Sequence, residues 1–222
     1  MEMRTAYHKK LREIQDEILA MGSVVSKAII RSIEALKNRD LTLAHQIIAD
    51  DRQVNGKRFE IEEKCIELIA TQQPMASDLR IIVSIFNITT EIERIGDYAA
   101  GIAKIVVMIG DEPPLKPLID IPRMADKTVD MLRRSLEAFI NRDAEAARKN
   151  IAEDDEVDHL YDQVFRELII FMAEDPKTIT RATRLIWVSH NLERASDRVT
   201  NICERVVYIV TGKMEEMEIS KY

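Results

Sequence analysis

The sequence predicts an all-α protein built as two tandem antiparallel three-helix bundles related by a pseudo-twofold repeat. Three observations support this prediction. Apolar residues recur at three- and four-residue steps through most of the 222 residues, which is the helical period. Aromatic residues make up only 5% of the chain, with six glycines and six prolines, a composition that suits helices better than sheets. The second half also repeats part of the first.

The first half contains three predicted helices. The first covers about 7–37 and ends at the polar segment 38–40, where Asp40 is a suitable N-cap for the second. The second helix continues to about Ala70, and Pro74 lies in the break that follows it. The third begins near Ser77 or Asp78 and carries isoleucines at regular spacing as far as Val106.

The second half begins after a proline-rich linker, 111–122, which holds four prolines and cannot remain helical. Asp143 is a suitable N-cap, Asp175-Pro176 is a predicted break, and Gly212 is a suitable C-cap. The predicted helices of this half are, in order, about 124–140, 143–173 and 178–211.

The two halves are related in sequence. Ser32–Asp40 resembles Ser135–Asp143 at an offset of 103, and Glu93-Arg94 matches Glu193-Arg194 at an offset of 100. We therefore expect a first repeat in 1–110, the linker 111–122, a second repeat in 123–212 and a charged tail in 213–222. This pattern does not tell whether the bundles stack end to end or side by side.

Composition excludes several classes of function. The net charge of −7 makes a nucleic acid a poor partner, because such proteins need a basic face. No apolar run is long enough to span a bilayer, and Met1–Lys10 is too polar for a signal peptide. Cys65 and Cys203 are far apart in sequence and are expected to be reduced core residues. We expect a soluble, cytoplasmic protein without membrane insertion.

Two acidic pairs recur at matching positions of the repeats. Glu93 and Asp97, and Glu193 and Asp197, are each four residues apart, so each pair shares one helix face. A helical projection places both pairs on an outer face, among small residues that leave room for a bound ion. Oxygen ligands suit hard cations such as Mg, Mn or Fe. A solvated helix face is the alternative explanation.

Four further residues are weaker candidates. Asp51 and Asp154 lie at aligned positions within apolar seams, where a carboxylate paired with a neighbouring helix is the simpler interpretation. His190 precedes Glu193 by three residues on the same face, and Asn201 follows Asp197 by four. Whether any of the four joins a metal site is left open.

With these motifs in place, the chain resembles the PhoU family of phosphate-transport regulators over nearly its whole length. The resemblance rests on the duplicated three-helix plan and on Gln73-Pro74-x-Ala76-x-Asp78-Leu79-Arg80. It rests also on the Glu-Arg-x-x-Asp motifs that begin at Glu93 and Glu193.

The resemblance implies a cytoplasmic, non-enzymatic protein that regulates phosphate uptake negatively. It implies partners in the phosphate ABC transporter, through its ATPase subunit, and in the phosphate-sensing histidine kinase. It implies multinuclear iron or zinc clusters at Glu93, Asp97, Glu193 and Asp197, with Mn or Mg as other ions that carboxylates accept. A homodimer is left open.

Two other functions remain in view. A carboxylate-bridged di-metal oxidase of the ferritin-like type would place an E-x-x-H motif on each of two core helices. Here Glu156–His159 is the one E-x-x-H segment, and the first repeat lacks both residues at the aligned positions. A metal-free helical scaffold is the third possibility, in which the acidic pairs serve only solubility.

Overall fold

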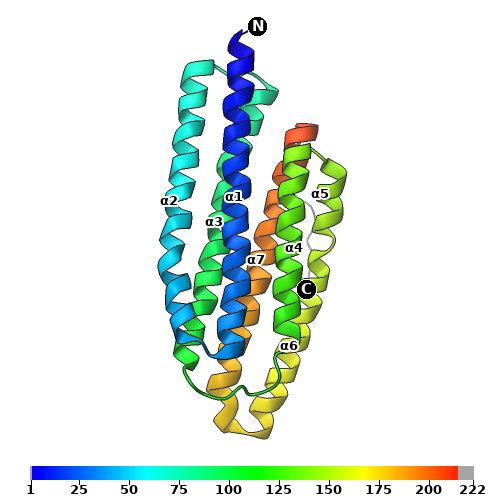
Figure 1. The fold of residues 1–222 in the computed structure, drawn as a ribbon. Coiled ribbons are helices and arrows are strands. Elements are labelled where there is room, and N and C mark those ends of the chain that lie inside the picture. The colour runs from blue at the N-terminus through cyan, green and yellow to red at the C-terminus, as the bar shows by residue number, and fades with distance from the viewer. Residues whose placement is uncertain (1, 215–222) are drawn as a thin grey trace.

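The computed structural model describes the chain from residue 2 to residue 214, with side chains from residue 5 onward. Long helices run side by side along one axis (Figure 1). The elements of this range are α1 (Glu2–Asn38), α2 (Leu41–Gln72), α3 (Ser77–Ile109), α4 (Asp120–Asn141), α5 (Ala144–Ile151), α6 (Asp154–Glu174), the 3-10 helix η1 (Pro176–Thr178) and α7 (Ile179–Thr211). The predicted all-α fold of two tandem bundles is confirmed. Helices α1–α3 form the first repeat, and α4–α7 form the second.

Helix ends fall at the predicted capping residues. The Asp40 carboxylate accepts a hydrogen bond from the Leu43 N–H, and Asp143 accepts from the N–H groups of Glu145 and Ala146. Gly212 ends α7 in the left-handed region, with φ of 76°, and its own N–H donates to the Tyr208 carbonyl. These contacts satisfy backbone groups that every helix terminus leaves without an intrahelical partner.

The second long helix of repeat two is interrupted. The sequence predicts one helix over 143–173, and that prediction is wrong, because α5 ends at Ile151 and α6 begins at Asp154. Glu153, in the break, is bound by Arg134 and Lys127 of α4. The interruption places Asp154 in the first turn of a new helix that packs against α7.

The connection between repeats is shorter than predicted, since α4 already begins at Asp120. Pro122 therefore lies inside the first turn of α4, where a missing N–H costs no intrahelical hydrogen bond. Of the predicted tail 213–222, only Lys213 and Met214 fall within the described residues.

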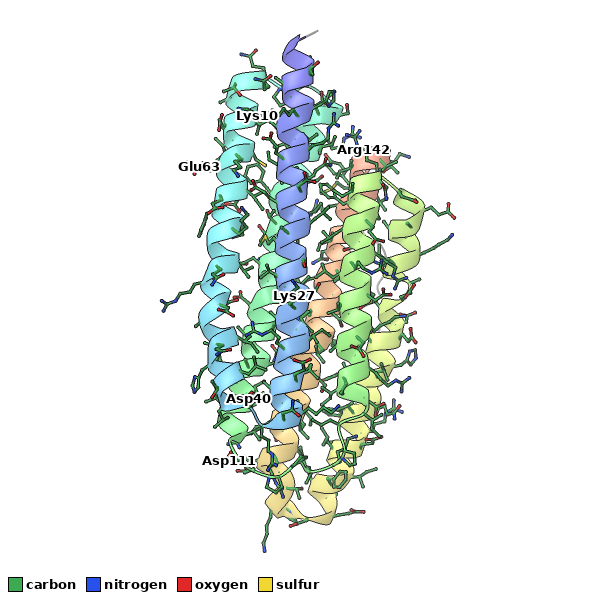
Figure 2. The ribbon with its side chains drawn as sticks, viewed as in Figure 1. Lys10, Lys27, Asp40, Glu63, Asp111 and Arg142 are labelled. Atoms are coloured by element: carbon green, nitrogen blue, oxygen red, sulfur yellow. The ribbon has the colours of Figure 1, made fainter. Side chains whose placement is uncertain are left out.

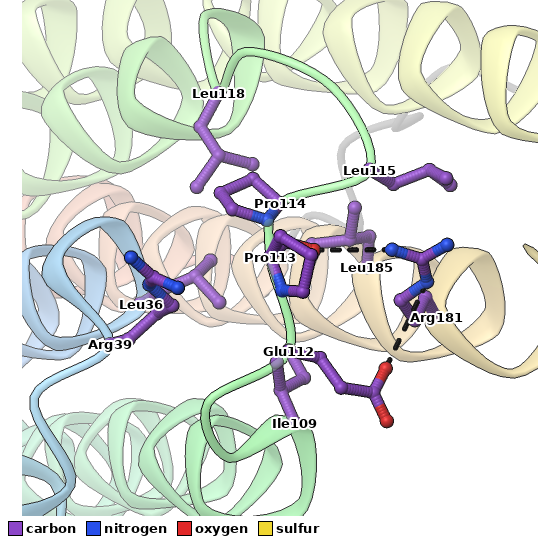
Figure 3. Close-up of a pocket in the computed structure, with 10 residues that line it drawn as sticks. All are labelled: Leu36, Arg39, Ile109, Glu112, Pro113, Pro114, Leu115, Leu118, Arg181 and Leu185. Carbon is purple, nitrogen blue, oxygen red and sulfur yellow. Dashed lines mark hydrogen bonds and ion pairs between the residues drawn. The ribbon is translucent and has the colours of Figure 1, made fainter.

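Arginines from both repeats hold this connection in place. Arg39 donates to the Asp111 carbonyl at 3.3 Å, and Arg181 of α7 donates to the Pro113 carbonyl at 3.3 Å. Arg181 also lies 3.9 Å from the Glu112 carboxylate, and these side chains line a small pocket with Pro114 (Figure 3). Figure 2 shows Asp111 at the same end of the molecule as Asp40.

The two repeats lie side by side rather than end to end. Their third helices, α3 and α7, run antiparallel and form the most extensive helix–helix interface, while α1 packs against α4 (Figure 1). Both α3 and α7 therefore pack against helices of both repeats. Cys65 and Cys203 are buried and unpaired, as predicted.

Candidate functional site

The acidic pair of the second repeat lies where α7 packs against α6. The two helices form an antiparallel hairpin, and the Thr178 hydroxyl closes its tip by donating to the Phe171 carbonyl. Glu193 is largely buried, with 14% of its side chain exposed. The neighbouring acids on α6 are Asp154 and Asp158, which are one helical turn apart. Four carboxylates from two helices therefore belong to one cluster, here called the second acidic cluster: Asp154, Asp158, Glu193 and Asp197.

Electrostatics in the second acidic cluster disfavour full ionisation. Burial, together with the charges of neighbouring carboxylates, raises the pKa of Asp154 to about 7, of Glu193 to about 7 and of Asp158 to about 6. Burial also raises the pKa of Asp197, although the adjacent Arg194 opposes this. A group of acids with raised pKa values is a favourable environment for a cation, which would remove the mutual repulsion.

Asp154 is the most buried member of the cluster, with only 2% of its surface exposed. One carboxylate oxygen, Oδ1, accepts a hydrogen bond from the Ser196 hydroxyl of α7. The other, Oδ2, is buried without a hydrogen-bond partner. The simpler interpretation of Asp154, a carboxylate paired with a neighbouring helix, therefore accounts for one of its two oxygens.

Two basic side chains border the cluster. Arg194 pairs with Asp197 at 3.0 Å and also lies within hydrogen-bonding reach of Tyr98 on α3. His190, whose side chain is about half exposed, has its Nδ1 3.2 Å from Glu193 Oε2, and partial desolvation together with the Arg194 charge lowers its pKa. A neutral imidazole is a competent metal ligand, so His190 remains a candidate.

The acidic pair of the first repeat has a different environment. Burial and the charge of Asp97 raise the pKa of both Asp51 and Glu93. The Nε atom of Arg58 on α2 lies 3.8 Å from Glu93 Oε1, so an arginine is already present beside this pair. Gly96 takes the place of Ser196, and a Cβ there would lie 3.7 Å from the Asp51 carboxylate.

The predicted outer face is wrong for α7 and holds only in part for α3, where Asp97 is exposed. The small residues around the acidic pairs are buried, not solvated: Thr89, Gly96 and Ala100 on α3, and Ser189, Ser196 and Thr200 on α7. Each third helix packs against its own bundle and also against the other repeat, but α3 keeps one exposed face that includes Leu79, Val83 and Met108. The acidic pairs lie beside their partner helices, and Asp97 alone among the four is exposed.

Comparison with known proteins assigns the family. Residues 18–106 and 121–206 each match the family described as PhoU domain. The chain belongs to the PhoU domain family. The chain is 38% identical, over 96% of its length, to the phosphate-specific transport system accessory protein PhoU homolog of Clostridium acetobutylicum, of which it covers 98%. A protein of the same description from Aquifex aeolicus is 37% identical, with 93% of each chain covered.

Solved structures agree with this assignment. The phosphate transport system regulatory protein PhoU from Streptococcus pneumoniae matches with a TM-score of 0.89 and 31% identity, over 95% of this chain and all of that one. PhoU from Pseudomonas aeruginosa matches with a TM-score of 0.87 and 34% identity, over 93% of this chain and all of that one. The duplicated helical plan is therefore that of PhoU proteins.

The carboxylates of the second PhoU domain are suitable metal ligands by type, but their present side-chain conformations do not form a metal site. Within residues 2–214, no three acidic, histidine or cysteine side chains converge closely enough to hold an ion as they stand. The unpartnered Oδ2 of Asp154 and the raised pKa values of its neighbours nevertheless match a donor set for a hard cation. Binding would need the carboxylates to turn, and Arg194 to leave Asp197.

Two residues in these PhoU domains escaped the sequence reasoning. Asp158 and Arg58 both lie on the second helix of their repeats, and neither belongs to the Glu-Arg-x-x-Asp motifs. The signal was available for Asp158, which follows the aligned Asp154 by four residues and so shares its helix face.

Asn201 lies elsewhere than its spacing indicates. Its Nδ2 donates to Glu91 of α3 at 3.3 Å, so Asn201 joins the two PhoU domains and not the acidic cluster. The E-x-x-H segment gives the oxidase hypothesis no support, because Glu156 is exposed and pairs with Lys127, and His159 is exposed as well.

Proposed function

We propose that this protein is a regulatory accessory protein of a phosphate-specific transport system that restrains phosphate uptake. The observation that carries the proposal is the match of both PhoU domains, over nearly the full length of the chain, to proteins described as accessory to such systems. The S. pneumoniae structure is described as regulatory, which agrees with the same role. The proposed role is non-enzymatic.

The finer role is that of a cytoplasmic adaptor between two partners. One is the ATPase subunit of the phosphate ABC transporter, and the other is the phosphate-sensing histidine kinase. Helices α3 and α7 form the interface between the two domains. The outer surfaces of α2, α5 and α6 lie away from this interface, and we assign the protein partners to them. Within residues 2–214, no helix combines the length and the apolar content needed to cross a membrane.

A bound metal ion is part of the proposal. The sequence-derived ligands are Glu93, Asp97, Glu193 and Asp197, and the second pair has the stronger support. The single observation behind that preference is the buried, unpartnered Oδ2 of Asp154 beside Glu193 and Asp197. A cation there would offset the repulsion between carboxylates, which is roughly 1–4 kcal/mol for charges 4 Å apart. Iron and zinc are the leading ions, and Mn and Mg compete for the same oxygens.

Elemental analysis of protein purified without added metal tests the metal. We expect bound metal in the wild type, and its loss in the variant Glu93→Gln/Asp97→Asn/Glu193→Gln/Asp197→Asn. Less than one metal per chain in the wild type would overturn metal binding and favour the metal-free scaffold. Oxygen-dependent turnover of ferrous iron by the purified protein would favour the di-metal oxidase instead.

Deletion of the gene in its host tests the regulation. We expect phosphate uptake and the expression of phosphate-starvation genes to rise when phosphate is abundant. Complementation with the wild-type gene should restore both to their starting values. Unchanged uptake and expression in the deletion strain would overturn the proposed role, whatever the metal content of the protein.

A further inference from the structure

The two PhoU domains differ at two positions of the helix that faces the acidic pair. At the offset of 103, Asn55 of α2 stands where α6 has Asp158, and Arg58 stands where α6 has Tyr161. The first change removes a carboxylate from the first domain. The second adds a guanidinium, whose Nε lies 3.8 Å from Glu93 Oε1.

The Arg58 side chain is held in this position from two sides. Its Nη1 donates to Glu62 Oε1 at 3.0 Å on the same helix, and its guanidinium carbon lies 4.5 Å from the centre of the Phe59 ring. Its Nε is buried without a hydrogen-bond partner, and the Glu93 carboxylate lies 3.8 Å away. Arg58 is thus a built-in cation beside Glu93 rather than a mobile surface arginine.

A third difference acts in the same direction. Lys104 of α3 occupies the position that Glu204 holds in α7, at the offset of 100. The Lys104 charge lowers the pKa of Asp51, against the larger effect of burial. The first domain therefore sets Arg58 and Lys104 against three acids: Asp51, Glu93 and Asp97.

The second domain has cations near Asp197, namely Arg194 and Arg198, but their compensation does not reach Asp154. Tyr161 is uncharged, and its ring contacts the rings of Phe165 and His190 instead of a carboxylate. Arg194 is the cation paired within the cluster, and it binds Asp197. The deepest acid, Asp154, keeps an unpartnered oxygen, whereas its counterpart Asp51 is only partly buried.

We propose that the two PhoU domains are not equivalent as metal sites: the second domain takes up the metal ion, and Arg58 fills that role in the first. This inference rests on the proposed metal binding, and it specifies which of the two domains binds the ion. Arg58 acts as a specificity residue, because a cation entering the first site would have to displace an arginine that is already paired. An ion entering the second site must displace Arg194 from Asp197, but it then meets four carboxylates, and the buried Asp154 among them has an unpartnered oxygen.

Zn²⁺ titration of the full, chelator-treated chain, followed by calorimetry and elemental analysis, tests this inference. Three variants are compared with the wild type: Glu193→Gln/Asp197→Asn, Glu93→Gln/Asp97→Asn, and the control Glu137→Gln/Glu145→Gln, which removes two exposed charges elsewhere. We expect the first to lose the bound Zn²⁺. The second and the control should keep the wild-type ratio of metal to chain.

A variant that gains a site makes the test independent of lost folding. Asn55→Asp/Arg58→Tyr gives the first domain the residue types of the second, and we expect it to bind additional Zn²⁺ with the original site intact. Thermal unfolding monitored by circular dichroism confirms that each variant is folded.

The outcomes separate the two proposals. A wild type that binds no Zn²⁺ overturns the proposed metal binding itself. A wild type that binds Zn²⁺ but loses it equally in both acid-pair variants overturns only the inequivalence. Unchanged binding in Asn55→Asp/Arg58→Tyr would contradict the role given to Arg58.

Discussion

One contact of Asp154 could be predicted from the sequence, and the environment of its second oxygen could not. Its place within an apolar seam predicted a carboxylate paired with a neighbouring helix, and the Ser196 hydrogen bond agrees with that prediction. The unpartnered Oδ2 could not be predicted, because it depends on which side chains surround the far side of the carboxylate. That detail, and not the pairing, is what points to a cation.

For Asn201 the sequence prediction is wrong, because the rule that residues four apart share a helix face becomes less accurate over two such steps. Four residues turn a helix by slightly more than one full turn, so each such step drifts by about 40°. One step keeps Asp197 beside Glu193, but two steps carry Asn201 to the side of α7 that faces α3. There it meets Glu91, which is also 3.5 Å from Arg198.

The first prediction concerns the pH dependence of the metal-free protein. The pKa of Asp154 rises from 3.8 to about 7 on folding, so the folded state binds more protons between these values. The free energy of unfolding should therefore fall as pH rises from about 4 to about 7, and level off above that range. Urea unfolding in EDTA at pH 5 and pH 8 measures the difference.

The variant Asp154→Asn is the control for that prediction. It removes the buried charge and keeps an acceptor for Ser196, so its stability should depend less on pH. At pH 8 it should be more stable than the metal-free wild type by on the order of 1–2 kcal/mol. Identical pH profiles for the two proteins would show that Asp154 is not the titrating group.

At the scale of elements, the helix boundaries were largely readable from the sequence. The caps Asp40 and Asp143 use local chemistry and were predicted correctly. The break between α5 and α6 was not, because Ala152 and Glu153 are ordinary helix formers. It coincides with ion pairs from another helix, since Lys127 and Arg134 of α4 both bind Glu153.

A matched pair of substitutions tests the weight of those ion pairs. Glu153→Ala removes a carboxylate shared by two cations and should cost about 1–3 kcal/mol of unfolding free energy. Asp50→Ala removes the aligned carboxylate of the first repeat, which is half exposed and pairs with Arg31, and should cost less than about 1 kcal/mol. Urea unfolding at pH 7 compares them.

Low pH provides the check on this interpretation. Hydrogen bonds from Arg134 hold the pKa of Glu153 at about 2, below its usual 4.5. The stability that Glu153 contributes is therefore present above about pH 4.5 and is lost as pH falls toward 2. A cost of Glu153→Ala that stays constant across this window would exclude the ion pairs as its cause.

At the scale of the whole molecule, the duplicated plan was predicted but the arrangement of its halves was not. The spacing of apolar residues predicts a single apolar stripe and an outer face for each third helix. In the structure Ile82 and Ile102 of α3 are both fully buried, although the helical period places them about 160° apart around the helix. An apolar face this broad requires neighbours on more than one side, and this signal was present in the sequence.

The contact between α1 and α4 gives the third prediction. Gly22 lies so close to Leu136 that even a Cβ at position 22 would overlap the leucine tip. Gly22→Leu should therefore destabilise the protein by about 1–3 kcal/mol through overpacking. Gly56→Leu, on α2 with no atoms near its Cβ, should be neutral or stabilising by up to about 1 kcal/mol. Thermal and urea unfolding measure both, and equal effects would contradict the close approach of the two helices.

The antiparallel interface of α3 and α7 has a consequence for the history of the chain. A single ancestral repeat could have formed an isologous dimer through its third helix, with each copy in the place that one half now occupies. The present halves no longer suit such pairing. Arg194 of the second half lies near Tyr98 of the first, and the residue of the second half that corresponds to Tyr98 is Arg198, so a pair of second halves would place two arginines together. Glu91 of the first half contacts Asn201 of the second, and the residue of the first half that corresponds to Asn201 is Gly101, so a pair of first halves would lose this hydrogen bond. At these positions each third helix therefore matches its covalently linked partner better than a copy of itself.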